Sequence, residues 1–207
     1  MKTIKLKLQN TSTIEAISHQ SFEEHDINND LKIYSLIFDD LVSLLNVDYP
    51  DLALWGTRFI PQRDMRISSA ISITPEDDKN IDHNLLLVGN IEDNLIYLTG
   101  VIAHEMRHFW QKRHYLKKFF NESNDYGSST NFMEDAAEID ADAFGFIYMA
   151  KKFNISIEEA AEILCPYEKT NNNSAYQKRI NLAHKLLDEF KPRQKLRNKI
   201  LRKLGIR

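Results

Sequence analysis

Two histidines and a glutamate lie at the spacing H-E-x-x-H in residues 104–108, within the segment "IAHEMRHFWQKRHYL". On an α-helix, positions i and i+4 differ by about 40° in azimuth, so His104 and His108 project from one face. Two neutral imidazoles placed in this way can ligate one Zn²⁺ ion, at about 2.0–2.1 Å each. Glu105 lies beside them, where its carboxylate can accept the proton of a metal-activated water as that water attacks a carbonyl. The spacing therefore predicts a zinc site with Glu105 as general base.

A catalytic zinc site needs a third protein ligand and an open fourth position. His114 falls where the pattern H-E-x-x-H-x-x-G-x-x-H places its last histidine. In this chain Gln111, a good helix former, replaces the glycine that lets the backbone turn back towards the metal. If the helix continues, His114 lies about 240° round from His108 and points away from the metal. We therefore expect His114 to be a surface histidine.

The acidic segment "EDAAEIDADAFGF", residues 134–146, offers a better third ligand. Glu138 and Asp142 are spaced i and i+4, so they share one face of the predicted helix. Glu138 is predicted to bind the metal, and Asp142 to accept a hydrogen bond from the other ring nitrogen of a liganding histidine. Glu134 extends the acidic stripe by one turn and is the alternative ligand. Asp140 lies about 200° from Glu138 and is expected to be solvated or to cap another element.

The elements that must position these residues follow from hydrophobic periodicity and from start and stop signals. One helix is predicted at 93–118 around the H-E-x-x-H segment, and a second at 132–152 around Glu138. The other predicted elements are a strand at 3–9, a helix at 30–46, at least two or three strands within 52–90, a short helix that begins at the capping-box pair Ser156 and Glu159, and two helices at 174–190 and 193–204 separated by Lys191-Pro192. Together they predict an α+β fold, with a small sheet packed on the two metal-ligand helices and a helical C-terminal tail.

The composition, 43% hydrophobic and 28% charged, is that of an ordinary globular protein. The single cysteine, Cys165, excludes an intramolecular disulfide and fits a reducing compartment. The first residues lack the apolar core of a signal peptide, and the longest apolar stretch, residues 95–103, is too short to span a bilayer. We therefore expect a cytoplasmic protein without a transmembrane segment.

The C-terminal segment is strongly basic although the whole chain has a net charge of −3. Residues 178–207 hold 11 Lys or Arg against 2 acidic residues, a local balance of +9. The tail spaces Leu196, Ile200, Leu201 and Leu204 along one helix face. Such a helix could contact nucleic acid, an anionic membrane surface or a partner's groove, or dock on the acidic remainder of the same chain. The predicted division is a domain at 1–170 and a helical basic extension at 171–207.

The two metal motifs together resemble a gluzincin, the zincin branch whose third ligand is a glutamate on a following helix. "HEMRHFWQ" followed by "EIDADAFGF" is most similar to the compact intracellular ImmA/IrrE-like metallopeptidases of bacteria and their mobile elements. The likeness covers roughly residues 85–165, with Gly145 where that family usually carries alanine. It implies a compact zincin-like fold for residues 1–170 and a side chain that stabilises the oxyanion, for which Tyr126 and Tyr148 are the candidates.

The predicted function is a zinc-dependent intracellular peptidase that hydrolyses peptide bonds of a protein or peptide substrate, such as a regulatory protein. The alternative is a zinc-containing regulatory or binding protein, of a mobile-element or stress-response type, without significant proteolysis. The intact Glu105 favours the peptidase, because a purely structural zinc site needs no base. A metal-free helical adaptor would require the two motifs to coincide by chance.

Overall fold

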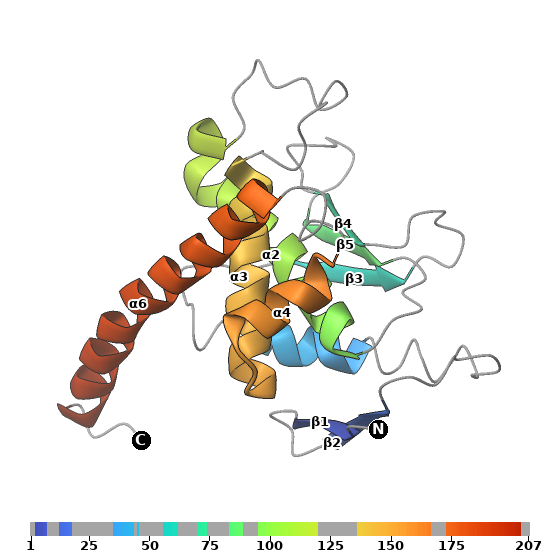
Figure 1. Ribbon diagram of the computed structural model, residues 1–207, viewed down its shortest axis with the longest axis horizontal. Helices are drawn as coiled ribbons and strands as arrows, with labels where there is room; N and C mark the ends of the chain where they lie inside the picture. The colour runs from blue at the N-terminus through green and yellow to red at the C-terminus, as the bar shows by residue number, and fades with distance from the viewer. Residues whose placement is uncertain are drawn as a thin grey trace.

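The computed structural model describes residues 3–7, 13–17, 35–43, 45, 56–61, 70–73, 83–88, 95–119, 136–166 and 173–203. The fold is α+β and mostly helical, with a small three-stranded sheet (Figure 1). Its labelled elements are β1 (Thr3–Lys7), β2 (Thr13–Ile17), β3 (Arg58–Pro61), β4 (Ala70–Ile73), β5 (Leu85–Val88), α2 (Leu95–Phe119), α3 (Ala136–Phe153), α4 (Ile157–Leu164) and α6 (Asn173–Lys203). Residues 35–43 are also helical.

β5 is the central strand of the three-stranded sheet. It pairs in parallel with β3 and antiparallel with β4, so that β4 is an outer strand of the sheet as described. Leu86 and Val88 are buried while the alternate residues Leu85 and Leu87 are half-buried, because successive side chains of a strand point to opposite faces. The buried face packs on α2 and on the helix at 35–43, which confirms the predicted small sheet.

β1 and β2 form a separate antiparallel pair, with Thr3 opposite Ile17. β1, Thr3–Lys7, lies within the strand predicted at 3–9, whose last two residues are outside the described ones. β2 was not predicted from the sequence. Its segment, "TIEAI", has only a short alternation of side chains, with an acidic residue at the centre, so its own preference for a strand is weak. Pairing with β1 stabilises it as a strand.

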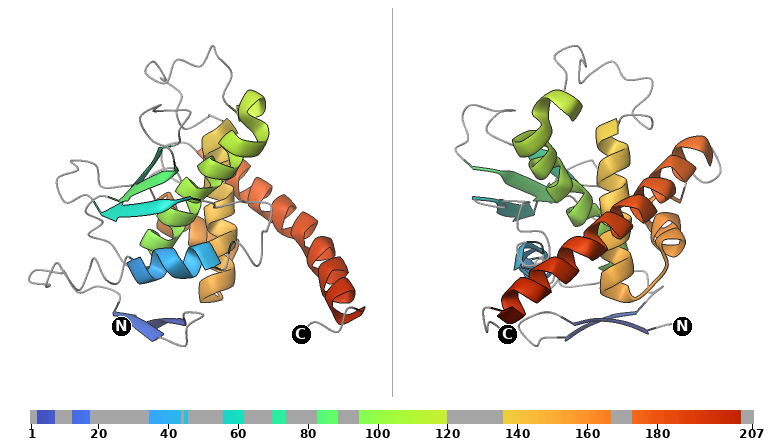
Figure 2. Two further views of the ribbon diagram at one scale, coloured as in Figure 1. Left: turned by 180° about the vertical axis from the view of Figure 1, so that it is seen from behind. Right: turned by 90° about the vertical axis from the view of Figure 1, so that its left-hand side faces the viewer.

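α3 is the central helix of the molecule (Figure 2). Its residues from Asp140 to Met149 are all buried, because α2, α4 and α6 pack around it. Phe144, Phe146 and Ile147 are 0% exposed although they point in different directions around the helix. A helix that is buried on all sides can place polar residues against more than one neighbour. Asp140 and Asp142 of α3 contact residues of α2 and α6 in this way.

Two glycines bring α2 and α3 close together. A Cβ atom on Gly145 would lie 3.2 Å from the backbone oxygen of Gly100 and 3.0 Å from Cδ2 of Leu164. A Cβ atom on Gly100 would lie 2.3 Å from Sδ of Met149. A side chain at Gly145 would therefore contact α2 and α4 more closely than ordinary van der Waals contact.

The helix predicted at 93–118 corresponds to α2, in which Tyr115 alone has non-helical backbone angles. The helix predicted at 132–152 corresponds to α3, although the residues before Ala136 lie outside the described ones. The predicted capping box is confirmed, since Ser156 Oγ accepts from Glu159 N at 3.1 Å at the start of α4.

The predicted break at Lys191-Pro192 is wrong. α6 is one helix from Asn173 to Lys203 and contains Pro192. A proline inside a helix removes one hydrogen bond and crowds the preceding turn. Here the good helix formers on both sides continue the helix past it.

The first half of α6 packs on α3 and α4, with Ala175, Tyr176, Ile180 and Ala183 buried. Its C-terminal half runs away from the body of the molecule (Figures 1 and 2). The division near residue 170 stays a prediction. Cys165 is buried as a free thiol. Within the described residues, no helix combines the length and apolarity needed to cross a membrane.

Candidate metal centre

His104, His108 and Glu138 come together into one cluster that could hold a metal ion. The two histidines lie one turn apart on α2, and Glu138 lies in the first turn of α3. The two Nε2 atoms are 3.0 Å apart. The Glu138 carboxylate faces both rings, with Oε2 at 3.2 Å from His104 Nε2 and Oε1 at 3.4 Å from His108 Nε2. The helix spacing of the two histidines and the packing of α3 against α2 thus put one potential ligand atom of each residue within 4.8 Å of the others.

The cluster is mostly shielded from water. The side chains of His104 and Glu138 are 15% and 14% exposed, and that of His108 is 10% exposed. Within this low-exposure environment a charged group is costly unless it is paired, so each polar atom of the cluster should have a partner. The partners differ for the two histidines.

His104 is held through its second ring nitrogen. Its Nδ1 lies 2.7 Å from Oδ1 of Asp142, one turn beyond Glu138 on α3. The other oxygen of Asp142 accepts from Nε of Arg179 on α6 at 2.6 Å. Because a carboxylate accepts hydrogen bonds, Nδ1 carries the proton and Nε2 is left to face the metal cluster.

His108 is held by an amide instead of a carboxylate. Its Nδ1 lies 2.8 Å from Oε1 of Gln111. The nitrogen of the same amide donates to Ala137 O at 2.9 Å and to Asp140 Oδ2 at 2.8 Å. Since these two partners are acceptors, the amide oxygen is the atom that faces His108, and Nδ1 of His108 is the donor. His108 Nε2 is therefore also free to bind a cation.

Asp140 is buried, and the expectation that it is solvated or caps another element is wrong. Arg107 donates to it twice, from Nε at 2.8 Å and from Nη2 at 3.2 Å. Its azimuth, about 200° from Glu138, would face water on a surface helix, but α3 has a neighbour on that side as well. The Arg107 guanidinium also lies over the ring of Trp110, 3.6 Å from its centre, which fixes the arginine further.

Glu105 is positioned by the sheet. Its Oε2 accepts from the backbone nitrogen of Ser72 on β4 at 2.9 Å. The side chain is half-buried and follows His104 directly on α2. A backbone hydrogen bond from an outer strand thus holds the predicted base, which directly follows the candidate ligand His104 on α2.

The charges around His104 favour a cation. Burial by itself lowers the pKa of His104, but the nearby Asp142, Glu138 and Glu105 outweigh it and hold that pKa well above its ordinary value. Burial raises the pKa of Glu138, and the contacts with the imidazoles of His104 and His108 outweigh it and lower that pKa strongly. Without a metal ion, a proton on His104 therefore balances the carboxylates. A metal ion would replace that proton.

Other predicted residues lie elsewhere. His114 is exposed and contacts Trp110, with ring centres 5.7 Å apart, so the structure does not bring it into the cluster. Tyr148 is 4% exposed inside the hydrophobic core, a position that favours packing over contact with a substrate. Tyr126 and Glu134 lie outside the described residues, as do the side chains of the basic tail from residue 189 onward.

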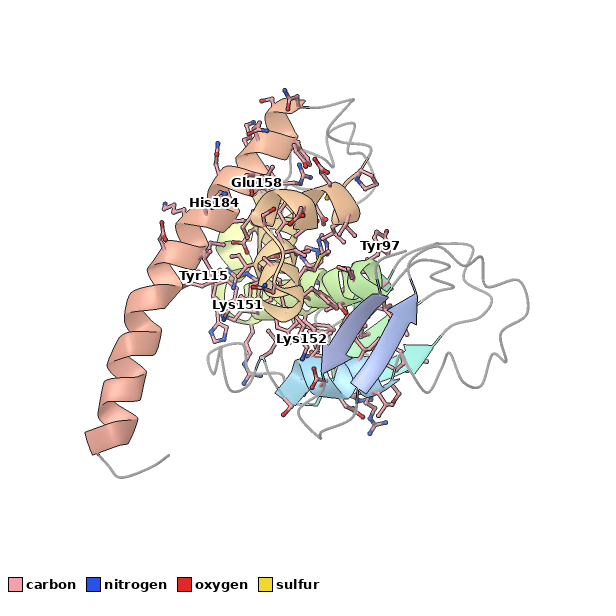
Figure 3. The ribbon with its side chains drawn as sticks, turned by 60° about the horizontal axis from the view of Figure 1, so that its bottom comes forward. Tyr97, Tyr115, Lys151, Lys152, Glu158 and His184 are labelled. Carbon is pink, nitrogen blue, oxygen red and sulfur yellow. The ribbon has the colours of Figure 1, made fainter. Side chains whose placement is uncertain are left out.

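The ring of His184 on α6 lies beside Glu158 on α4, with Nε2 at 2.9 Å from Oε1 (Figure 3). Both side chains are about half exposed. This pair joins the two helices at the surface and is separate from the metal cluster.

Sequence reasoning missed Arg107, Gln111 and Arg179 as supports of the site. Gln111 alone had a local signal, because a residue at i+3 from His108 lies on the same helix face. Arg179 had none, since it lies 37 residues beyond Asp142.

Comparison of the chain with protein-family models, with curated proteins and with solved structures gave no significant match. The resemblance to ImmA/IrrE-like metallopeptidases stays a prediction. Any functional argument therefore rests on the geometry of the cluster.

Proposed function

We propose that this protein is a zinc-dependent peptidase of the gluzincin type. His104, His108 and Glu138 would hold the zinc ion, and Glu105 would be the general base. The observation that carries the proposal is the convergence of three electron-pair donors. With Nδ1 protonated on both rings, the two Nε2 lone pairs and the Glu138 carboxylate face one another at 3.0–3.4 Å. Such groups repel one another unless a proton or a cation lies among them.

The spacing of the ligand atoms supports zinc as the ion. A tetrahedral ion with bonds of about 2.0–2.1 Å holds its ligand atoms about 3.3 Å apart. The two Nε2 atoms are 3.0 Å apart, and each lies near one oxygen of Glu138, His104 Nε2 at 3.2 Å from Oε2 and His108 Nε2 at 3.4 Å from Oε1, which is close to that value. Calcium and magnesium prefer sets of oxygen ligands, whereas two imidazoles and one carboxylate suit zinc. Three protein ligands also leave the open position that a catalytic zinc site keeps.

Zinc bound there would supply a Lewis acid that makes a water molecule acidic and polarises a carbonyl group. The chain's own contribution is proton transfer and orientation. Glu105 can accept a proton from the attacking water and pass it to the leaving amine, because it stands next to the ligand His104. The hydrogen bond from Ser72 N keeps its carboxylate at that position and restricts its rotation.

The runner-up is a zinc-containing regulatory or binding protein that uses the same ligands without hydrolysis. It accounts for the His-His-Glu cluster equally well. It does not explain why Glu105 follows the first ligand, His104, and why its carboxylate is held by a hydrogen bond from the sheet.

The test is Glu105→Gln, which keeps the size of the side chain and removes the base. The zinc-loaded wild type should cleave members of an unbiased peptide library, and the variant should keep its zinc while hydrolysis falls by about 10²–10⁴-fold. Mass spectrometry of the digests gives the rates. Glu162→Gln, an exposed position on α4, is the matched control and should cleave like the wild type.

Unchanged hydrolysis in Glu105→Gln would remove Glu105 from its role. A zinc-loaded wild type that cleaves nothing in the library or in cell extract would favour the regulatory protein.

A further inference from the structure

A buried arginine of α6 lies behind the candidate metal centre, against Asp142. Arg179 is 1% exposed, and its Nε donates to Oδ2 of Asp142 at 2.6 Å. Oδ1 of the same carboxylate lies 2.7 Å from Nδ1 of His104. We propose that Arg179 is a positioning residue of the metal centre, which orients His104 through Asp142 and makes metal affinity depend on α6. This inference rests on the metal-binding part of the proposed function and does not require peptidase activity.

The Asp142 carboxylate is held from two sides by two different helices. A carboxylate on an aspartate can rotate about its side-chain bonds, and a single hydrogen bond to His104 would leave that rotation open. The second bond, from Arg179, fixes the carboxylate plane and so fixes the direction in which Oδ1 faces the imidazole. The imidazole ring is in turn held with Nε2 towards Glu138, 3.2 Å away.

The other histidine has a support of the same kind. His108 contacts Gln111, Gln111 contacts Asp140, and Asp140 accepts two hydrogen bonds from Arg107. Each ring thus has a chain of buried polar groups behind it that ends in an arginine. Arg107 comes from the same helix as the histidines, whereas Arg179 comes from a helix that begins after α4.

A purely structural role for Arg179 explains less. The apolar side chains of Ala175, Tyr176, Ile180 and Ala183 already bury one face of α6 against its neighbours. A buried ion pair adds little net stability, because the cost of removing both charges from water offsets their attraction. The attachment of α6 therefore does not need an arginine, but the orientation of Asp142 does.

The experiment compares three purified full-length variants with the wild type. Arg179→Met keeps an unbranched apolar stem and removes the charge and the donors, and Arg179→Lys keeps the charge and an ammonium donor but loses the planar guanidinium. Ile180→Ala is the matched control, because it removes core packing from the next residue of α6, whose apolar side chain cannot hydrogen-bond Asp142. Zinc affinity is measured by competition with a chromogenic chelator. Folding is measured by circular dichroism and thermal unfolding in excess chelator.

We expect Arg179→Met to bind zinc about 10–100-fold more weakly than the wild type, as is usual when a partner behind a metal ligand is lost. The zinc affinity of Arg179→Lys should lie between those of Arg179→Met and the wild type. Ile180→Ala should unfold at a lower temperature, with zinc affinity within about twofold of the wild type, because its loss is one of packing. The visible spectrum of bound Co²⁺, which reports the ligand field, should change in Arg179→Met and stay unchanged in Ile180→Ala.

A double variant tests whether Arg179 acts through Asp142. In the Asp142→Ala background, Arg179→Met should cost no further zinc affinity, since the carboxylate it orients is gone. Wild-type affinity and an unchanged Co²⁺ spectrum in Arg179→Met, or additive losses in the double variant, would overturn the inference. If Arg179→Met does not fold, wild-type affinity in Arg179→Lys overturns it. A wild type that binds no metal would overturn the proposed function as well, so the two failures are distinguishable.

Discussion

The two histidines of the H-E-x-x-H segment have the same expected role but different supports. His104 donates to a carboxylate that also carries an arginine, whereas His108 donates to the neutral amide of Gln111. A carboxylate partner makes an imidazole a stronger base than an amide partner does. His104 should therefore be the stronger of the two nitrogen ligands, and Gln111 should serve to fix the tautomer and direction of His108.

Gln111→Met tests that role, because it keeps most of the volume and removes both the acceptor for His108 and the donor to Asp140. We expect zinc affinity to fall by about 10–100-fold, because His108 loses the partner that selects its tautomer. Chelator competition measures the change. Gln177→Met, at an exposed position on α6, should leave the affinity unchanged. Equal affinities in the two variants would show that Gln111 does not orient the ligand.

At the residue scale, the pairs of site residues that share one face of a helix could be predicted from the sequence. The i and i+4 spacing puts His104 with His108, and Glu138 with Asp142, because backbone geometry sets the azimuth of each residue. Azimuth does not say what lies opposite a residue. The burial of Asp140 against Arg107 could therefore not be predicted from the sequence.

The contact between α2 and α3 determines whether the ligands of the two helices can meet. Gly100 and Gly145 face each other across this contact, with no room for a Cβ atom in ordinary contact at either position. The sequence predicted both helices and the capping box of α4, because those signals are local. It did not predict the glycine contact, nor the continuation of α6 through Pro192. Both depend on what surrounds the segment and not on its own propensity.

Gly100→Ala should destabilise the fold, because the new Cβ atom would lie 2.3 Å from Sδ of the buried Met149. Overpacking of this kind costs about 1–3 kcal/mol, from which the better helix propensity of alanine subtracts up to about 1 kcal/mol. Urea unfolding measures the cost. In a Met149→Ala background the cost of Gly100→Ala should be smaller, because the atom it meets has gone. Equal costs in both backgrounds would show that Met149 does not fill the space at Gly100.

The whole molecule gathers the site from segments that are distant in the sequence. α2 carries two of the candidate ligands and the predicted base, and α3 carries the third candidate ligand. β4 donates a hydrogen bond to that base, and α6 places Arg179 against Asp142. The α+β class could be predicted because it follows from the sum of local periodicities. The docking of α6 on α3 and α4 could not be predicted. In the sequence, the segment with Tyr176, Arg179 and Ile180 has only the pattern of an amphipathic helix in a basic region. The arrangement explains why a basic extension begins with buried residues.

The central claim is that two helices, and not one extended motif, supply the metal ligands. The measurement that tests it most directly is the zinc content per chain, by inductively coupled plasma mass spectrometry, of the wild type, Glu138→Ala and His114→Ala. We predict about one zinc ion per chain in the wild type and in His114→Ala, because His114 is exposed and lies outside the cluster. Glu138→Ala should lose most of its zinc while remaining folded by circular dichroism. Full zinc content in Glu138→Ala together with loss in His114→Ala would contradict the account.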